Sequence, residues 1–148
     1  MNSFIQSIQK IIERDLTVLE KEINLYPTQE AIWIVNGAIK NSAGNLCLHL
    51  CGNLQHYIGK VLGGSAYVRN RENEFSATGI SRDKLLLEIS QTKAAVINSL
   101  GKLNPEALQN NYPEEVFKTP MTTEYFLIHL TTHLGYHLGQ INYHRRLF

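Results

Sequence analysis

Four long segments of the chain carry apolar residues at the spacing of an amphipathic helix, and this pattern limits the possible folds more than any other feature. The segments cover about residues 2–24, 43–62, 82–103 and 121–146. A helix with one apolar stripe must bury that stripe against another element. Four such helices must therefore pack against one another, and the sequence predicts an all-α fold, a four-helix bundle.

Breaks and capping residues separate these four segments. Gly63-Gly64 ends the second helix, and Ser81 suits the N-cap of the third. Thr119 suits the N-cap of the fourth helix, with Pro120 at its first position. The connections cover about residues 25–42, 63–80 and 104–119. The 148 residues are enough for one domain with a real core, so we expect a single domain over 1–148.

The overall charge and hydropathy argue against two classes of partner. The net charge is +1 and the pI is about 7.8, without the clusters of lysine and arginine that mark nucleic-acid binding. No stretch approaches the ~20 apolar residues of a membrane span, and the first residues lack the apolar core of a signal peptide. We therefore expect a cytoplasmic protein with no nucleic-acid or membrane partner, in which the two cysteines are reduced thiols.

Histidines are concentrated near the end of the chain, where four of the six lie within sixteen residues. On one helix, His129, His133, His137 and His144 fall at roughly 0°, 40°, 80° and 60° around the axis. Two imidazoles four residues apart can share one metal ion, whereas two that are eight residues apart lie about 12 Å from each other along the axis. One ion can therefore use His129 with His133 or His133 with His137, and the spacing leaves both pairs open.

A third ligand has to come from another helix. His49 and His56 are the remaining histidines, and they share one face of the second helix, with Asn53 between them. Cys47 and Cys51 point away from that face. We interpret the two cysteines as small core residues in preference to a redox pair.

From spacing alone, the histidine cluster is either a metal site or a row of hydrogen-bonded histidines in the core. Imidazole ligands suit zinc, nickel, copper or iron. The chain has no Glu-x-x-His and no His-Glu-x-x-His sequence, so the ferritin-like di-iron and zinc-protease patterns are absent. Binding of haem or another small ligand by the same histidines is a third hypothesis, which we rank last.

Three stretches of the sequence resemble the DinB-like family of metal-binding four-helix bundles. His133-Leu-Gly-Tyr-His137-Leu-Gly-Gln140 is similar to the His-x-x-x-His-x-Gly-Gln signature on the last helix of that family. His49, in LCLHLCGNLQHYIG, stands at the place of the family's third histidine on the second helix. The loop GGSAYVRNRENEF, with His-Leu-x-Gly-Asn-Leu before it, resembles one bacterial branch of the family. The likeness extends over nearly the whole chain in helix order and length.

The resemblance implies an up-down four-helix bundle of the DinB/YfiT-like type that binds one divalent transition metal through His49, His133 and His137. Zinc or nickel is favoured, and iron or manganese is compatible. The resemblance further implies a homodimer and a metal-dependent thiol S-transferase or hydrolase that acts on a small molecule, with a low-molecular-weight thiol as a candidate partner. The alternative is a non-catalytic metal-binding bundle with a structural, sensing or assembly role, and the lack of an obvious general base favours it.

Seven further residues are candidates for the wall of the pocket or for contacts with the ligands: His129, His56, Asn53, Gln140, Tyr136, Arg69 and Arg71. Asn53 and Gln140 are suited to accept the free ring N–H groups of ligand imidazoles, or equally to satisfy backbone groups at helix contacts. Arg69 or Arg71, in the loop after the second helix, is suited to hold an anionic group of a ligand, although a solvated loop with local ion pairs is the simpler interpretation. Trp33 is expected to anchor the core under the first connection.

Overall fold

The computed structural model describes residues 2–148, which fold into five α-helices. The helices are α1 (Ser3–Leu25), α2 (Ala43–Leu54), α3 (Arg71–Ser76), α4 (Arg82–Gly101) and α5 (Thr123–Arg145). Three short helical segments accompany them: η1 (Glu30–Trp33), η2 (Gln55–Lys60) and η3 (Pro105–Gln109). Over residues 2–148 there is no β-strand, only one isolated bridge, so the prediction of an all-α fold is confirmed. None of the helices in this range combines the length and the apolar character needed to cross a membrane.

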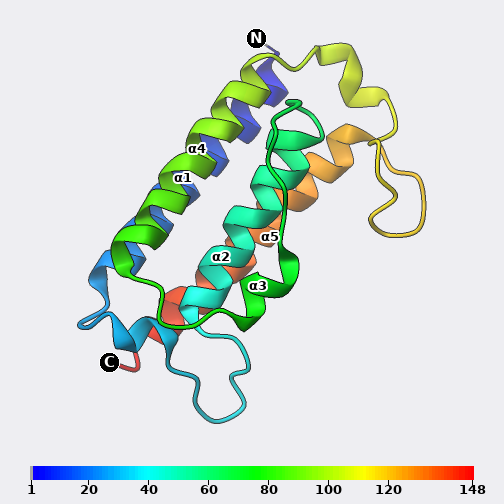
Figure 1. Ribbon diagram of the computed structural model, residues 1–148. Helices are drawn as coiled ribbons and strands as arrows, with labels where there is room; N and C mark the ends of the chain where they lie inside the picture. The colour runs from blue at the N-terminus through cyan, green and yellow to red at the C-terminus, as the bar shows by residue number, and fades with distance from the viewer. Residues whose placement is uncertain (1) are drawn as a thin grey trace.

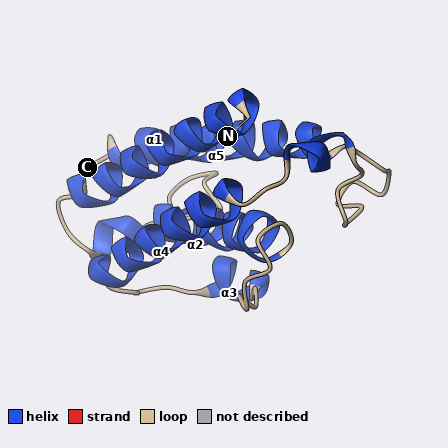
Figure 2. Ribbon diagram, turned by 90° about the horizontal axis from the view of Figure 1, so that it is seen from above, coloured by secondary structure: helices blue, strands red, loops and turns tan. Residues whose placement is uncertain are grey.

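The four long helices form two layers, with α1 beside α5 in one and α4 beside α2 in the other (Figure 2). Lys93 on α4 lies 3.2 Å from Glu20 on α1 and ties the two layers together. Within one layer, Asn142 on α5 donates to Glu22 on α1 at 2.7 Å. The short α3 packs on the outer side of α2 (Figure 2).

The helices do not alternate in direction along the chain as predicted. Gln55 donates to Thr92 at 3.1 Å, and further along both helices Gly63 lies against Ser99, so the second helical segment and α4 run the same way. Residues 61–81 return along the length of α2 before α4 begins (Figure 1). The strict up-down order is therefore wrong at this step. A connection of about twenty residues is long enough to bring the chain back to the starting end, whereas a short turn would have forced antiparallel neighbours.

Apolar side chains of all four long helices meet between the two layers. Helix α1 contributes Ile5, Ile8, Ile12, Leu16, Leu19 and Ile23. Cys47 and Cys51 are free thiols buried in the same core, as expected for small core residues. Helix α2 is buried around most of its circumference because α3, α4 and α5 all contact it. A polar residue on α2 therefore needs hydrogen-bond partners from these neighbouring elements.

The start of the fourth long helix differs from the prediction. Thr122 is the N-cap of α5, and its hydroxyl accepts a hydrogen bond from the Tyr125 N–H at 3.1 Å. Thr119 and Pro120 lie before the helix, in the segment that leads to the isolated bridge between residues 111 and 122. The bridge keeps this segment out of the helix because Tyr112 N–H donates to the Met121 carbonyl at 2.8 Å.

The second predicted helix also differs, because only its first part is α-helical. Residues Gln55–Lys60 form a π-helical segment, with the Val61 N–H donating to the His56 carbonyl at 2.9 Å. Helix α3 lies in a stretch that was predicted to be a loop, and it is capped by the Asn70 side chain. The predicted N-cap Ser81 does cap α4. Of these two departures, helix α3 lies next to the histidine cluster, where its Glu74 contacts His49 at 3.0 Å.

Trp33 packs between the first connection and the start of α2. Its indole ring lies so close to Gly44 that a Cβ at that position would meet ring carbons at 2.6 Å. Its Nε1–H donates to the Ile80 carbonyl at 3.0 Å. Trp33 is half-buried and contacts the core, in line with the expected anchoring role.

Candidate metal centre

The crossing of α2 and α5 brings three histidines together. His49 projects from α2, and His133 and His137 project from successive turns of α5. Each offers a ring nitrogen, and these three nitrogens lie within 4.8 Å of one another. The ring centroids are 5.0 Å apart for His49 and His133, 5.3 Å for His49 and His137, and 4.6 Å for His133 and His137. The structure therefore selects one of the two pairs that helical spacing left open.

His129, the other candidate partner of His133, lies outside this cluster. Its ring is 6.1 Å from that of His133 and packs against aromatic rings, at 4.7 Å from Phe117 and 5.8 Å from Phe126. His129 is therefore part of an aromatic wall next to the cluster. His144 is farther along α5 and is buried with both ring nitrogens in hydrogen bonds, to the Tyr26 hydroxyl at 2.6 Å and the Ile34 carbonyl at 2.7 Å.

Hydrogen bonds orient two of the three imidazoles. The Nδ1–H of His49 donates to Glu74 Oε1 at 3.0 Å, and the Nδ1–H of His137 donates to Gln140 Oε1 at 2.7 Å. In the neutral ring, a proton on Nδ1 leaves the lone pair on Nε2. Both rings therefore present Nε2 as a possible ligand atom, in the arrangement by which proteins fix metal-binding histidines. Gln140 therefore lies where it can accept the free ring N–H of His137, one of the two roles considered for it from the sequence.

The distance between the Nε2 atoms of His49 and His133 is close to that of two imidazole nitrogens that coordinate the same ion. Their Nε2 atoms are 3.1 Å apart. Two imidazole nitrogens at this distance need either a proton between them or a cation that both coordinate. A tetrahedral ion with bonds of about 2.0–2.1 Å holds its ligand nitrogens about 3.3 Å apart, so the two rings need only a small adjustment. The Nδ1 of His133 is buried without a partner.

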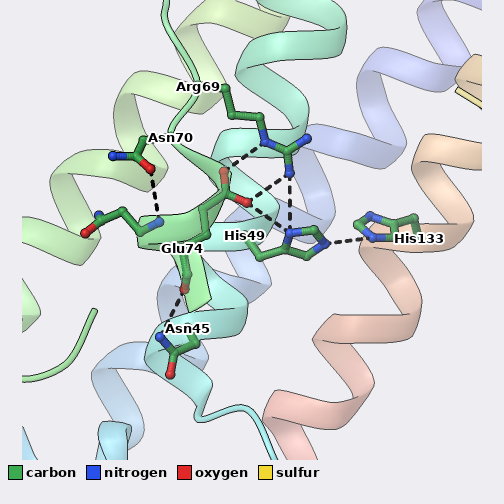
Figure 3. A network of polar contacts seen from close by, with 7 residues as sticks. Asn45, His49, Arg69, Asn70, Glu74 and His133 are labelled. Carbon is green, nitrogen blue, oxygen red and sulfur yellow. Dashed lines mark hydrogen bonds and ion pairs between the residues drawn. The ribbon is translucent and has the colours of Figure 1, made fainter. Parts of the chain in front are cut away.

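Glu74 connects this centre to α3 and was not singled out from the sequence. Its carboxylate lies between His49 and Arg69, which donates to it through Nε and Nη2 at 2.9 Å each (Figure 3). Burial raises the pKa of Glu74, but the hydrogen bonds from His49 and Arg69 and the positive charge of Arg69 outweigh that effect and lower the pKa below its usual value. Glu74 is therefore an ionised acceptor that holds the proton of His49 on Nδ1.

Local structure around α3 explains how Glu74 reaches His49. The Asn70 side chain accepts from the Asn73 N–H at 3.1 Å and starts the helix. Asn45 on α2 donates through Nδ2 to the carbonyls of Glu74 at 3.0 Å and Ala77 at 2.8 Å, which holds α3 against α2 (Figure 3). The carboxylate then passes over Gly52, where a Cβ would lie 2.0 Å from Oε2. Only glycine at position 52 leaves room for this carboxylate.

The sequence offered little signal for Glu74. It stands in a loop-like run of alternating charges, RNRENEF, that has no helical or strand period. One hint is Gly52, three residues after His49, because nothing else in the sequence calls for a glycine inside this helix. Glycine inside a helix costs about 1 kcal/mol relative to alanine and often marks a close approach by another group.

The other residues that were predicted to line the pocket differ in their burial and in their contacts with the cluster. Arg69 is half-buried and paired with Glu74, and Arg71 is exposed, with its guanidinium 5.3 Å from the centre of the Phe75 ring. His56 contacts Glu114 at 3.1 Å, away from the cluster. Tyr136 is exposed, with its ring 5.1 Å from that of His137.

Asn53 does not have the role predicted for it. It is buried, yet its Oδ1 has no hydrogen-bond partner among residues 2–148, so it does not orient an imidazole. Glu74 occupies that role at His49, because α3 brings a carboxylate from outside α2. The prediction that Asn53 accepts from a ligand imidazole is therefore wrong.

Two hollows lie along α5, one toward each end. The smaller one, of about 240 Å³, is lined by His49, His133 and His129 together with Asn53 and both arginines of the loop. The larger one, of about 770 Å³, lies between α5 and residues 38–41 and is lined by Gln140 but by none of the three clustered histidines. A molecule that reacts at the cluster therefore has its space in the smaller hollow.

The clustered imidazoles of α5 are neutral at ordinary pH. Burial, followed by repulsion from the neighbouring imidazoles, lowers the pKa of His133 to about 3. Burial also lowers the pKa of His137, although the hydrogen bond to Gln140 opposes the shift. Neutral imidazoles are the form that binds metal ions.

These shifts predict how the stability of the protein without bound metal depends on pH. An unfolded histidine titrates near pH 6.5, so below that pH the unfolded chain binds more protons than the folded one. The contribution of His133 to the free energy of unfolding is complete above about pH 6.5 and is lost as the pH falls toward 3. Urea unfolding after dialysis against a chelator should give a lower free energy of unfolding at pH 5.0 than at pH 7.5. A smaller decrease is expected for His133→Gln. Equal decreases in the wild-type protein and in this variant would contradict the lowered pKa of His133.

Comparison with known proteins gives one family. The family model described as "Protein of unknown function (DUF1572)" matches residues 1–148. No curated protein matches the chain. The match covers every element that builds the histidine cluster, but the description attaches no chemistry to it.

Proposed function

The chain belongs to the family described as protein of unknown function (DUF1572), and we propose that it binds one divalent transition metal ion through His49, His133 and His137. The observation that carries the proposal is the convergence of three ring nitrogens from two helices within 4.8 Å. Zinc or nickel is our first choice, because ligand sets made only of imidazole suit these borderline metals. The family resemblance keeps iron and manganese compatible.

The residues around the cluster fit such an ion. Two of the three rings have their Nδ1–H groups bound to acceptors, Glu74 and Gln140, so their Nε2 lone pairs face the shared space. A hydrogen bond between the Nε2 atoms of His49 and His133 would satisfy those two rings, but it does not account for the third imidazole, that of His137, at 5.3 Å and 4.6 Å from them. This support does not depend on the family resemblance.

We further propose that the centre acts on a small molecule, as a thiol S-transferase or a hydrolase. Three protein ligands leave at least one position free, where a divalent ion would supply Lewis acidity toward a thiol or water. Within the protein, Glu74 holds a proton on His49 Nδ1, and Phe117 and Phe126 line an apolar wall of the adjacent hollow. A low-molecular-weight thiol is the candidate second substrate.

A non-catalytic metal-binding role is the alternative, and one observation favours it. No carboxylate among residues 2–148 lines the small hollow, and Glu74, which contacts His49, is already engaged by His49 and Arg69. A general base for hydrolysis is therefore not evident in the hollow. In this role the ion would tie α2 to α5.

We also propose that the chain is a DinB-like four-helix bundle and a homodimer. The four long helices and the positions of the three histidines on the second and last of them support the first part. Large apolar side chains exposed on α5, namely Tyr125, Ile128, Tyr136 and Tyr143, support the second.

The proposal is tested by metal analysis followed by an activity measurement. Protein purified without a polyhistidine tag should contain, or take up in equilibrium dialysis, about one zinc or nickel ion per chain. The loaded protein should then accelerate the reaction of a low-molecular-weight thiol with monobromobimane, and His137→Ala should do neither. Protein that takes up no ion would refute the metal site. Protein that binds the ion and melts at a lower temperature after chelation, but accelerates no thiol in a panel of cellular thiols, would establish the non-catalytic role.

A further inference from the structure

The small hollow beside His49 and His133 combines an apolar wall with a cationic one. On one side it is closed by aromatic and aliphatic side chains of α5 and of the segment before it: Val116, Phe117, Phe126 and Leu130. On the other side it meets the two arginines of the loop that leads into α3. The volume, about 240 Å³, is below the range of about 300–1,000 Å³ typical of sites for drug-sized ligands. The hollow therefore has room for a small molecule or for one end of a larger one.

The two arginines differ in how their charge is balanced. Arg69 donates twice to Glu74, and its side chain is only 10% exposed, so its charge is compensated within the protein. Arg71 has no ion pair with any of residues 2–148, and its guanidinium lies against only the face of the Phe75 ring. No carboxylate among these residues lines the hollow. The positive charge of Arg71 is therefore uncompensated at the edge of the hollow.

An ion bound by the three histidines would add to the positive charge of Arg71. Three neutral imidazoles contribute no negative charge, so an ion held by them would keep its full charge of two. Buried or half-buried positive charge is stabilised when a ligand supplies the opposite charge. The composition of the hollow therefore favours an anionic ligand.

Asn53 provides a second, independent indication that a polar ligand occupies the hollow. It is 7% exposed, it lines the hollow, and its Oδ1 makes no hydrogen bond with any of residues 2–148. A buried acceptor without a donor is costly, and such a group in a native protein needs an explanation. An N–H or O–H group of a ligand in the hollow would satisfy it.

We propose that the hollow binds a small molecule with a carboxylate held by Arg71 and a hydrogen-bond donor directed at Asn53. The inference rests on the proposed function, because it names the class of substrate that the same metal centre would meet. The planar guanidinium of arginine donates two parallel hydrogen bonds to a carboxylate, which gives orientation as well as affinity. A ligand held in this way places its remaining end toward His49 and His133.

A matched pair of thiols tests this assignment. N-acetylcysteine carries a carboxylate and an amide N–H, and N-acetylcysteine amide differs only in having a neutral carboxamide in place of the carboxylate. In calorimetric titrations of the zinc-loaded protein, the carboxylate should bind about tenfold more tightly or better, the factor that a charge-assisted hydrogen bond supplies. Arg71→Gln should remove this preference without changing the zinc content, whereas Arg14→Gln, an exposed charge on α1, should retain it.

The outcomes separate this inference from the metal site. Equal affinities for the two thiols, no binding of either to protein that holds zinc, or an unchanged preference in Arg71→Gln would overturn the assignment while the metal site stands. Failure of the wild-type protein to take up zinc would overturn both. A loss of affinity for both thiols in Asn53→Leu, with the carboxylate preference kept, would support the second contact.

Discussion

Replacing His133 with alanine is expected to abolish tight metal binding by the protein. His133 contributes to both short distances in the cluster, at 3.1 Å between its Nε2 and that of His49 and at 4.6 Å between its ring and that of His137. Without it, the remaining two imidazoles lie on different helices and cannot hold an ion alone. Loss of a hydrogen-bond partner of a ligand costs about 10- to 100-fold in affinity, and loss of the ligand itself should exceed 100-fold. Competition with a chromophoric chelator measures this change.

His129→Ala is the matched control for this experiment. It removes the same side chain from the same helix, four residues away, but from the aromatic wall outside the cluster. Its metal affinity should stay within a few-fold of the wild-type value. The His133 variant should also keep its helical circular dichroism, because Nδ1 of His133 has no partner to lose. Equal losses of affinity in the two variants would show that the ion, if any, is not held by the cluster.

Replacing Gly52 with alanine is expected to damage both the metal centre and the fold. The added methyl group would lie 2.0 Å from Oε2 and 2.7 Å from Cδ of Glu74, so the carboxylate has to leave its place between His49 and Arg69. Displacing one member of a buried ion pair leaves the others uncompensated and costs on the order of 3 kcal/mol. The free energy of unfolding from urea titration should fall by about this amount, and metal affinity should fall by about 10- to 100-fold.

Two further variants test whether the effect comes from the close contact at position 52 and from the charge of Glu74. Gly135→Ala is the matched glycine in α5, where a Cβ would meet no atom within 4 Å, and it should leave stability unchanged or raise it by about 1 kcal/mol. Glu74→Gln keeps the size of the side chain but removes its charge, and it should reproduce the loss of metal affinity. If Gly52→Ala proved as harmless as Gly135→Ala, the close approach of Glu74 to α2 would be wrong.

Much of the site was open to prediction because helical spacing acts over short distances along the chain. Four apolar stripes imply four packed helices, and the positions of His133 and His137 four residues apart place their rings on one face. The competing pair with His129 could not be excluded in this way, because it has the same spacing. Only the packing of α2 against α5 puts His49 opposite one pair and leaves the other against Phe117.

The direction of the helices and the role of Glu74 were beyond the reach of the sequence. A long connection is compatible with either direction of the next helix, and residues 61–81 contain no periodic signal that tells how far the chain returns (Figure 1). Glu74 belongs to this connection and meets His49, twenty-five residues earlier, only because α3 docks on α2 through Asn45 and Gly52.

The amino-acid sequence by itself determined the all-α class, the helices that carry the histidines and the face on which each histidine lies, because these follow from local periodicity. The tertiary structure decided which histidines meet, which carboxylate orients His49 and which arginine has no ion pair. Those properties depend on contacts between residues far apart in the chain, and a contact of that kind is set by how whole elements pack.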